Sequence, residues 1–283
     1  MAGLPRSGGG LGWMLGSVVL FNVANLLVKD LTHVPTQQLV FLRSAFSLLA
    51  LSAYIRWHGL PFWGVNRRWL VVRGLSGVVS LTAFFYTLKH IPLASATVIQ
   101  YTSPIFTVLL ASQLLGQTIR PIQWLLLGLA FTGVLMVKGF DPAVSWGMWG
   151  LGLLSAGFAA VSYIATAKCR DTDHPVGIVL WFHLIGTPVM GITSGLTWVP
   201  LTGWDWAGAL GIAALSVVAQ VAMSVALHRE DAASIMPLKY VGALLAAVFG
   251  YFLFDEVLRS GAVLGMLLVV CAIAANTWLA ARR

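Results

Sequence analysis

Long runs of apolar residues, separated by short polar stretches, recur along the whole chain. A helix needs about 20 such residues to cross a bilayer, and ten runs come close to that length. Their predicted bounds are 11–29, 37–56, 69–89, 93–115, 122–138, 147–168, 175–196, 204–227, 232–254 and 261–281. Backbone groups inside lipid must be hydrogen-bonded internally, and the alternation typical of barrel strands is absent. The pattern therefore predicts an all-α membrane protein with ten transmembrane helices.

The composition agrees with a membrane protein and excludes a water-soluble one. Of the 283 residues, 59% are hydrophobic and 9% are charged, whereas soluble domains carry about 25% charged residues. Disordered chains are polar, so disorder is excluded as well. The two cysteines, Cys169 and Cys271, provide neither a disulfide framework nor the spacing of metal ligands. We therefore expect no cofactor and no bound metal.

Basic residues are distributed unevenly between the two ends of the predicted helices. Eleven lie on the side of the amino terminus: Arg6, Arg56, Arg67, Arg68, Arg73, Arg120, Lys168, Arg170, Arg229, Arg282 and Arg283. Four lie on the other side: Lys29, Lys89, Lys138 and Arg259. Cytoplasmic loops are enriched in Lys and Arg, so both termini are predicted to be cytoplasmic, in a cell (inner or plasma) membrane. The net charge of +8 thus reflects topology, and no nucleic-acid partner is expected.

The second half of the chain is similar to the first when the two are aligned so that Gln100-Tyr101 falls on Lys239-Tyr240. We call this alignment the repeat register. Each half contains five predicted helices, and because five is odd, one half must be inverted in the membrane relative to the other. Inverted repeats are typical of secondary transporters that bind their substrate near the midplane. The predicted five-helix repeats are residues 1–139 and 140–283.

Several short motifs resemble the EamA-type transporters of the drug/metabolite transporter superfamily. In the first half they are Val40-Phe41-Leu42-Arg43, His90-Ile91-Pro92-Leu93-Ala94-Ser95-Ala96, Tyr101 and Pro104-Ile105-Phe106. In the second half they are Ala232-Ala233-Ser234, Pro237-Leu238 and Asp255-Glu256. The resemblance covers essentially the whole chain. It implies alternating access, export of amino acids or other metabolites, and a cavity surrounded by all predicted helices except the fifth and tenth.

The sequence departs from the family pattern in two places. The family often has Gly-Glu directly after the fourth helix of each half. This chain has Gly116-Gln117 after the fourth predicted helix and Asp255-Glu256 after the ninth. Pro104 aligns with Ala243, so the kinks of the fourth and ninth helices are predicted to differ. Pro188 and Pro237 also interrupt predicted helices, because proline removes a backbone hydrogen bond.

Two charged residues lie deep inside predicted helices. Arg43 and Lys239 each stand about seven residues from a helix start, where a charge costs roughly 2.5–3.5 kcal/mol on insertion scales. No Asp or Glu lies at such depth, so we expect an anionic group of a substrate, or a water-filled cavity, to offset these cations. The alternative for Arg43 is that its long stem extends to the headgroups or that it caps carbonyls. The expected substrates are small anionic or zwitterionic metabolites, such as amino or carboxylic acids.

Further polar and aromatic residues inside the predicted helices complete the candidate substrate site. They are Asn22, Asn25, Gln100, Tyr101, Tyr163, Trp181, His183, Gln220 and Tyr240. Amides in membrane helices either line a cavity or join helices, and His183 is either a structural donor or a proton carrier. Because no membrane carboxylate is available to carry protons, a facilitator or an exchanger is predicted.

Three alternatives remain beside the transporter. Gly74-Leu75-Ser76-Gly77 matches the nucleophile motif of serine intramembrane proteases, with His183 as the base. A passive channel or a structural membrane subunit would also suit ten helices. The motifs Gly12-xxx-Gly16 and Gly261-xxx-Gly265 indicate close helix packing, either within the chain or in a homodimer formed through peripheral helices. An enzymatic activity is not expected.

Overall fold

The computed structural model describes residues 9–91, 93–138, 145–254, 264–265, 267–272, 275 and 279. The first half forms α1 (Gly10–Asp30), α2 (Thr36–Trp57), α3 (Arg67–His90), α4 (Leu93–Gln100), α5 (Ser103–Leu115) and α6 (Pro121–Lys138). The second half forms α7 (Trp146–Cys169), α8 (Pro175–Gly195), α9 (Gly203–Arg229), α10 (Ala232–Ile235), the 3-10 helix η1 (Met236–Tyr240) and α11 (Val241–Phe254). The described segments contain no strand, so the all-α prediction is confirmed for them.

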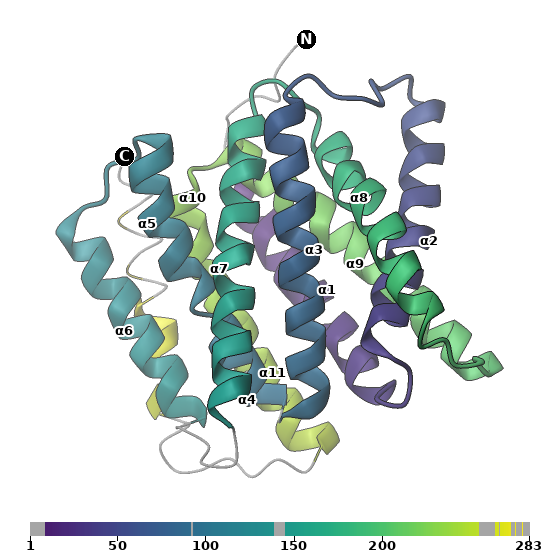
Figure 1. Cartoon of the computed structure of the whole chain (residues 1–283). Helices are drawn as coiled ribbons and strands as arrows, with labels where there is room; N and C mark the ends of the chain where they lie inside the picture. The colour runs from purple at the N-terminus through teal and green to yellow at the C-terminus, as the bar shows by residue number, and fades with distance from the viewer. Residues whose placement is uncertain are drawn as a thin grey trace.

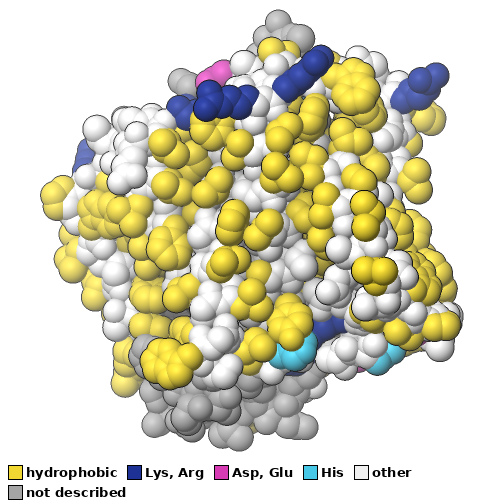
Figure 2. All heavy atoms as spheres, in the orientation of Figure 1, with side chains coloured by type: hydrophobic (Ala, Val, Ile, Leu, Met, Phe, Trp, Pro, Cys, Tyr) yellow, Lys and Arg dark blue, Asp and Glu magenta, His cyan; other side chains and the backbone are white. Residues whose placement is uncertain are grey.

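The described part of the chain has the surface of a multi-pass membrane protein. Seven of its helical stretches are long and apolar enough to cross a membrane, with Ala232–Leu253 counted as one, while Ser103–Leu115 and Pro121–Gly133 are shorter apolar helices. Figure 2 shows a broad band of hydrophobic side chains, with Lys and Arg gathered along its upper edge. The predicted tenth helix, 261–281, and Asp255-Glu256 lie largely outside the described residues, as do Arg6, Arg259, Arg282 and Arg283.

The predicted fourth helix is wrong in one respect, because the chain does not stay helical from 93 to 115. α4 ends at Gln100 and α5 begins at Ser103. Pro104 lacks the N–H that would bond the carbonyl of Gln100, so the helix breaks one turn before the proline. The Thr102 hydroxyl donates to the carbonyl of Ile99 at 2.8 Å and so compensates in part for the interrupted ladder. Pro104 therefore lies in the first turn of α5 rather than at a kink within one continuous helix.

The ninth predicted helix is interrupted as well, over a stretch that overlaps the equivalent place. α10 ends at Ile235, and the 3-10 helix η1 leads from Met236 to Tyr240 before α11 begins. The repeat register places Tyr101, at the first break, on Tyr240, at the second. The prediction that the two helices differ in their kinks is confirmed, since residues 101–102 separate two α-helices in the first half, whereas a five-residue 3-10 helix interrupts the second.

The most extensive helix contacts join the two halves of the chain. α3 packs along α7, α1 along α9 and α2 along α8, and Figure 1 shows α3 and α7 side by side across the front of the bundle. In the repeat register, α3 corresponds to α9 and α7 to α1, so the contact of α3 with α7 is equivalent to that of α9 with α1. Because α2 corresponds to α8, the contact between these two helices is its own equivalent. These contacts bury two large apolar clusters, one containing Met14 and Met223 and the other Phe85 and Phe182.

Substitution of Gly242 tests how tightly the two interrupted helices pack against each other. A Cβ at this position would overlap the hydroxyl of Tyr101 and approach the amide of Asn22. We expect Gly242→Ala to destabilise the protein by about 1–3 kcal/mol, the usual cost of overpacking a core. Thermal unfolding in detergent micelles would measure this change.

Gly157→Ala is the matched control for Gly242→Ala. A Cβ on Gly157, in α7, would meet no atom within 4 Å among the described residues, and replacing a helical glycine gains about 0.5–1 kcal/mol. The midpoint of this variant should stay the same or rise. Equal midpoints for the two variants would show that the contact between the breaks is loose.

Candidate functional site

A cavity lies between the two apolar clusters, near the middle of the long helices. Its volume, including the open mouth, is about 950 Å³. Its described lining comes from α1, α2, α3, α4, α7, α8, α9 and η1, with Tyr101 at the first helix break. These segments correspond to the eight predicted helices that were expected around the cavity. Met14 and Val18 of one apolar cluster and Phe85 and Phe182 of the other form parts of its wall.

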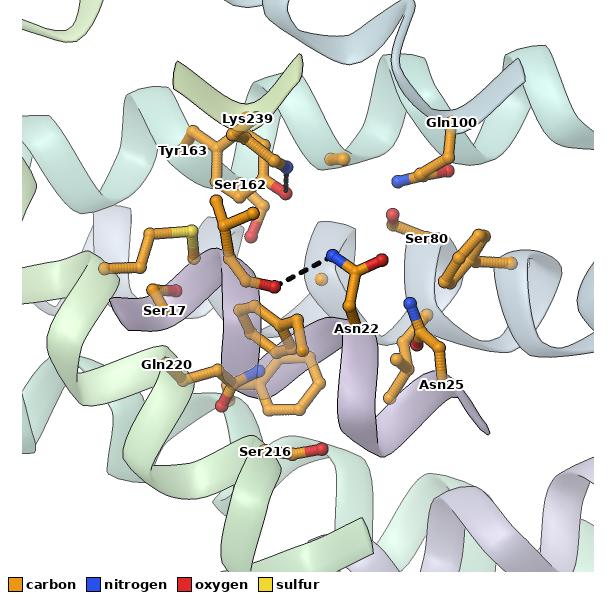
Figure 3. A pocket seen from close by; sticks show the side chains of 18 of the residues that line it. Ser17, Asn22, Asn25, Ser80, Gln100, Ser162, Tyr163, Ser216, Gln220 and Lys239 are labelled. Atoms are coloured by element: carbon orange, nitrogen blue, oxygen red, sulfur yellow. Dashed lines mark hydrogen bonds between the residues drawn. The ribbon is translucent and has the colours of Figure 1, made fainter. Parts of the chain in front are cut away.

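The structure brings eight of the eleven expected site residues to this cavity. They are Asn22, Asn25, Arg43, Gln100, Tyr101, Tyr163, Gln220 and Lys239. Figure 3 shows the amides of Asn22, Asn25, Gln100 and Gln220 around the same space, with Lys239 and Tyr163 on one side of it. Hydroxyls that the sequence analysis did not single out also line the cavity: Ser17, Ser80, Thr97, Ser162 and Ser216.

Arg43 is a buried cation without a counter-ion among the described residues. Its side chain extends from α2 and is 1% exposed, so it does not extend to the headgroups. The guanidinium carbon lies 5.5 Å from the centre of the Phe182 ring and 6.0 Å from that of Phe85. Within the described part of the chain, neither its Nε nor its Nη1 has a hydrogen-bond partner. These two unpaired donors belong to a side chain that forms part of the cavity wall.

Arg73 is a second buried arginine, and the sequence analysis assigned it wrongly to the cytoplasmic end of a helix. It is 3% exposed and lines the cavity from α3. Its Nη1 donates to the Ser162 hydroxyl at 2.6 Å, and its guanidinium carbon lies 5.0 Å from the centre of the Phe182 ring. The sequence analysis missed this cavity-lining role because Arg73 lies close to the basic pair Arg67-Arg68. The spacing of Arg73, Gly77 and Ser80 at i, i+4 and i+7, which places them on one helix face, would have indicated it.

Lys239 provides the third positive charge of the cavity. It belongs to the 3-10 segment η1, where the interrupted helix brings its ammonium group against α7. The Nζ donates to the hydroxyl of Tyr163 at 2.5 Å and lies 4.3 Å from the centre of that ring (Figure 3). No Asp or Glu is found among the described lining residues. The described ion pairs do not involve Arg43, Arg73 or Lys239 either.

Neutral amides fill the space between the cations, and three of them are fixed by hydrogen bonds. The Asn22 Nδ2 donates to the carbonyl of Val18 at 2.8 Å. The Gln100 Oε1 accepts from the Ser155 hydroxyl at 2.8 Å. The remaining ends of these two amides face the cavity, where they can donate to or accept from a polar ligand.

His183 fixes the third amide, that of Gln220, through a hydrogen bond from outside the cavity lining. It is fully buried, and its Nε2 pairs with the Gln220 Oε1 at 3.0 Å. An amide oxygen only accepts, so Nε2 carries the proton of this hydrogen bond. His183 thus lies next to the cavity wall without lining it, and it fixes the orientation of a residue that does.

Two other expected site residues lie away from the cavity lining. The Trp181 Nε1 donates to the carbonyl of Trp63 at 3.2 Å, and its ring packs against a small cluster that includes Leu70. Tyr240 is fully buried, with its ring centre 6.1 Å from that of Tyr101. Tyr240 therefore supports a lining residue, whereas Trp181 belongs to the packing between α3 and α8.

Ser76 and His183 do not form a nucleophile and base pair. The Ser76 hydroxyl donates to the carbonyl of Val72 at 2.5 Å, whereas His183 pairs with Gln220. The glycines of the motif serve packing instead. A Cβ on Gly74 would overlap Ile185 of α8, and one on Gly77 would collide with the Phe182 ring and the Arg73 guanidinium. The motif thus brings α3 close to α8 and makes room for the arginine.

Comparison with known proteins agrees with this architecture. The model of the EamA-like transporter family matches the chain twice, over residues 8–139 and 145–278. The chain is 32% identical to the pseudopaline exporter CntI of Pseudomonas aeruginosa, over 89% of this chain and 90% of that protein. It is 22% identical to the S-adenosylmethionine uptake transporter of Rickettsia felis, over 93% of this chain and 90% of that one.

A further relative and a solved structure extend the comparison. The riboflavin transporter of Rhizobium johnstonii is 25% identical, over 92% of this chain and 88% of the relative. A crystal structure of a protein with 17% sequence identity superposes with a TM-score of 0.80, covering 96% of this chain and 98% of the other. At that identity the superposition shows a shared fold and nothing more.

The stability of an Arg43→Met variant tests whether the guanidinium is structural or functional. An unpaired buried charge weakens the folded state, and replacing buried ionic groups by apolar ones of similar volume is often neutral or stabilises by about 1–4 kcal/mol. We therefore expect Arg43→Met to raise the thermal unfolding midpoint in detergent, or at least not to lower it.

Lys29→Met is the contrasting variant. The Lys29 Nζ donates to the carbonyls of Leu88 and Ile91 at 3.1 and 2.8 Å, so its removal leaves two backbone acceptors without that donor and should lower the midpoint. If Arg43→Met lowered the midpoint as much as Lys29→Met, the guanidinium of Arg43 would have a structural role.

Proposed function

Because the chain belongs to the EamA-like transporter family, we propose that it is a secondary transporter that exports small anionic or zwitterionic metabolites, such as amino or carboxylic acids. The single observation that carries this proposal is the buried guanidinium of Arg43, which belongs to the cavity lining and has two donors without a partner among the described residues. A desolvated cation of this kind is costly unless a counter-charge arrives. An anionic group of a substrate supplies that charge and gains charge-assisted hydrogen bonds.

The charge of the cavity supports an anionic or zwitterionic substrate over a cationic one. Arg43, Arg73 and Lys239 all belong to the lining, and its described part contains no acidic residue. An organic cation would meet repulsion in a space of low dielectric constant. Asn25 and the other amides can accept hydrogen bonds from the ammonium group of a zwitterion.

The arrangement of the helices supports alternating access by two inverted repeats. In the repeat register, the bounds of α2 agree closely with those of α8, Pro175–Gly195, and α3 falls on α9. The family model also matches each half separately. Both helix breaks reach the cavity region, as the discontinuous helices of transporters commonly do. In this proposal the two halves rock against each other around the cavity.

The contacts at one end of the bundle favour a transporter over a passive channel. Lys29 bonds the carbonyls of Leu88 and Ile91, and Lys89 bonds the carbonyl of Val34. These bonds tie α1, α2 and α3 together at the end opposite Gly10. A bundle whose one end is tied in this way suits a cycle of closed and open states better than a permanent pore.

We propose export from the cytoplasm across the cell membrane, with both termini on the cytoplasmic side. The relative with 32% identity is named an exporter. With Arg73 in the cavity, ten basic residues remain on the side of the termini against four on the other, so the positive-inside rule still favours this orientation. Among the described residues, nothing lies close to Gly12 and Gly16, and we propose α1 as the face through which a homodimer would form.

A Lys239→Gln variant tests the role of positive charge in transport. The change recreates the Gln-Tyr pair of the first half while it removes the ammonium group. We expect transport of an acidic substrate to fall at least tenfold, because a hydrogen bond to a charged group contributes about 1.5–3 kcal/mol. The measurement is uptake into proteoliposomes, screened over amino acids, carboxylates and organic cations.

Lys168→Gln is the control for that variant. Its ammonium lies 6.0 Å from the centre of the Trp69 ring, in the last turn of α7 and outside the cavity lining, so transport should be unchanged. Normal transport by Lys239→Gln, or a preference of the wild type for organic cations, would overturn the proposed substrate class.

Reporter fusions test the proposed orientation. A reporter active only in the cytoplasm, fused after residue 283 or before residue 1, should be active at both ends, whereas one inserted between α1 and α2 at residue 33 should be inactive. Activity of a periplasmic or extracellular reporter at residue 283 would contradict the orientation.

A further inference from the structure

The three cations of the cavity form one row. Arg43 and Arg73 share an aromatic ring, and Lys239 is joined to Arg73 through two neighbouring residues of α7. Arg43 and Arg73 both lie against the ring of Phe182, with their guanidinium carbons 5.5 and 5.0 Å from its centre. Arg73 also bonds Ser162, and Lys239 bonds the next residue, Tyr163. The row therefore leads from α2 over α3 to η1 along one wall of the cavity. Aromatic faces attract cations and so lessen the repulsion within the row.

One anionic group cannot offset this row. The described lining carries three positive charges and no negative one. A single carboxylate would pair with one or two of the cations and leave another without a counter-charge. That arrangement is costly for a buried ion such as Arg43 or Arg73, and less so for Lys239, which is partly buried. The neutral partners Ser162 and Tyr163 satisfy donors of Arg73 and Lys239 but supply no charge.

We infer that the substrate carries at least two carboxylate groups, one held by the Arg43–Arg73 pair and one by Lys239. The inference rests on the proposed function, which by itself requires only one anionic group. In the first subsite, the Nε and Nη1 of Arg43 and the Nε of Arg73 have no partner among the described residues, and guanidinium groups match the planar geometry of a carboxylate. The ammonium of Lys239 has further donors besides the one that bonds Tyr163.

The space between the two subsites suits a polar linker. Asn22 and Gln100 each use one end of their amide within the protein, and Gln220 is held by His183. Their remaining donors and acceptors, with the nearby hydroxyl of Ser80, can bind amino, hydroxyl or amide groups. A dicarboxylate with such groups along its chain would be held at both ends and in the middle.

The inference can be tested by binding of matched acids to the full-length protein in detergent, at constant ionic strength. The probes are succinate, glutarate, adipate and suberate, each compared with the monocarboxylate of the same length: butyrate, valerate, hexanoate and octanoate. We expect the best dicarboxylate to bind at least tenfold more tightly than its monocarboxylate, as measured by isothermal titration calorimetry.

Variants of each subsite should remove this preference. Arg43→Gln, Arg73→Gln and Lys239→Gln should each weaken binding of the best dicarboxylate at least tenfold, while the monocarboxylate loses less. Arg170→Gln is the control, because Arg170 follows α7 and pairs with Asp171 and Asp231 outside the cavity. It removes the same charge from the protein and should leave both affinities unchanged.

The possible outcomes separate this inference from the proposed function. Equal affinity for mono- and dicarboxylates would overturn the inference and leave an anion transporter in place. Binding of no acid in either series, or tighter binding of organic cations, would overturn both. If a subsite variant failed to fold, as judged by its thermal unfolding, the comparison of the two series on the wild type would still decide.

Discussion

The constraint on which this structure depends is the burial of positive charge in a bundle whose described cavity lining has no acidic residue to balance it. Arg43 is enclosed by helices on all sides, yet two of its nitrogens have no partner among the described residues. Such a group persists only where the surrounding packing compensates for it. Gly77 makes room for the neighbouring arginine and for Phe182, and that ring attracts both guanidinium groups. The fold thus maintains a site that is stable enough to form and that, as we propose, is completed by an anion.

The broken helices make the polar cavity compatible with a membrane interior. A continuous helix bonds all its interior backbone groups and offers a ligand only side chains. At Tyr101 and at η1 the ladder is interrupted, and Gln100 and Lys239 stand at these interruptions. Tyr101 and Tyr240 pack against each other there, so the two breaks support one another. Local irregularity, which would be costly against lipid, is confined to the place where the protein lines a cavity.

The sequence predicted the helices well because a bilayer requires long apolar runs, and the predicted bounds of α2 and α8 agree closely with those of the structure. The prolines Pro104 and Pro237 indicated interruptions of the fourth and ninth helices, whereas α8 continues through Pro188. Where each helix stops was not predicted, because hydropathy does not report backbone hydrogen bonds. Arg73 was misassigned because a cation in the second turn of a helix is compatible with either an interface or a cavity. Trp181 was misplaced for a related reason: a helix that is apolar all round does not reveal which face points inward.

Positions that line the cavity in the two halves are equivalent in the repeat register, but their side chains differ in chemistry. The repeat register places Leu81 on Gln220, and both line the cavity. It also places Arg43 on Phe182, the residue against which that arginine lies, and Gln100 on Lys239. At each of these positions one half supplies a charge or a polar group where the other supplies a different side chain. If the two halves rock against each other during transport, as we propose, the scaffold can be symmetric while the substrate keeps one orientation, because only one side of the cavity carries each cation.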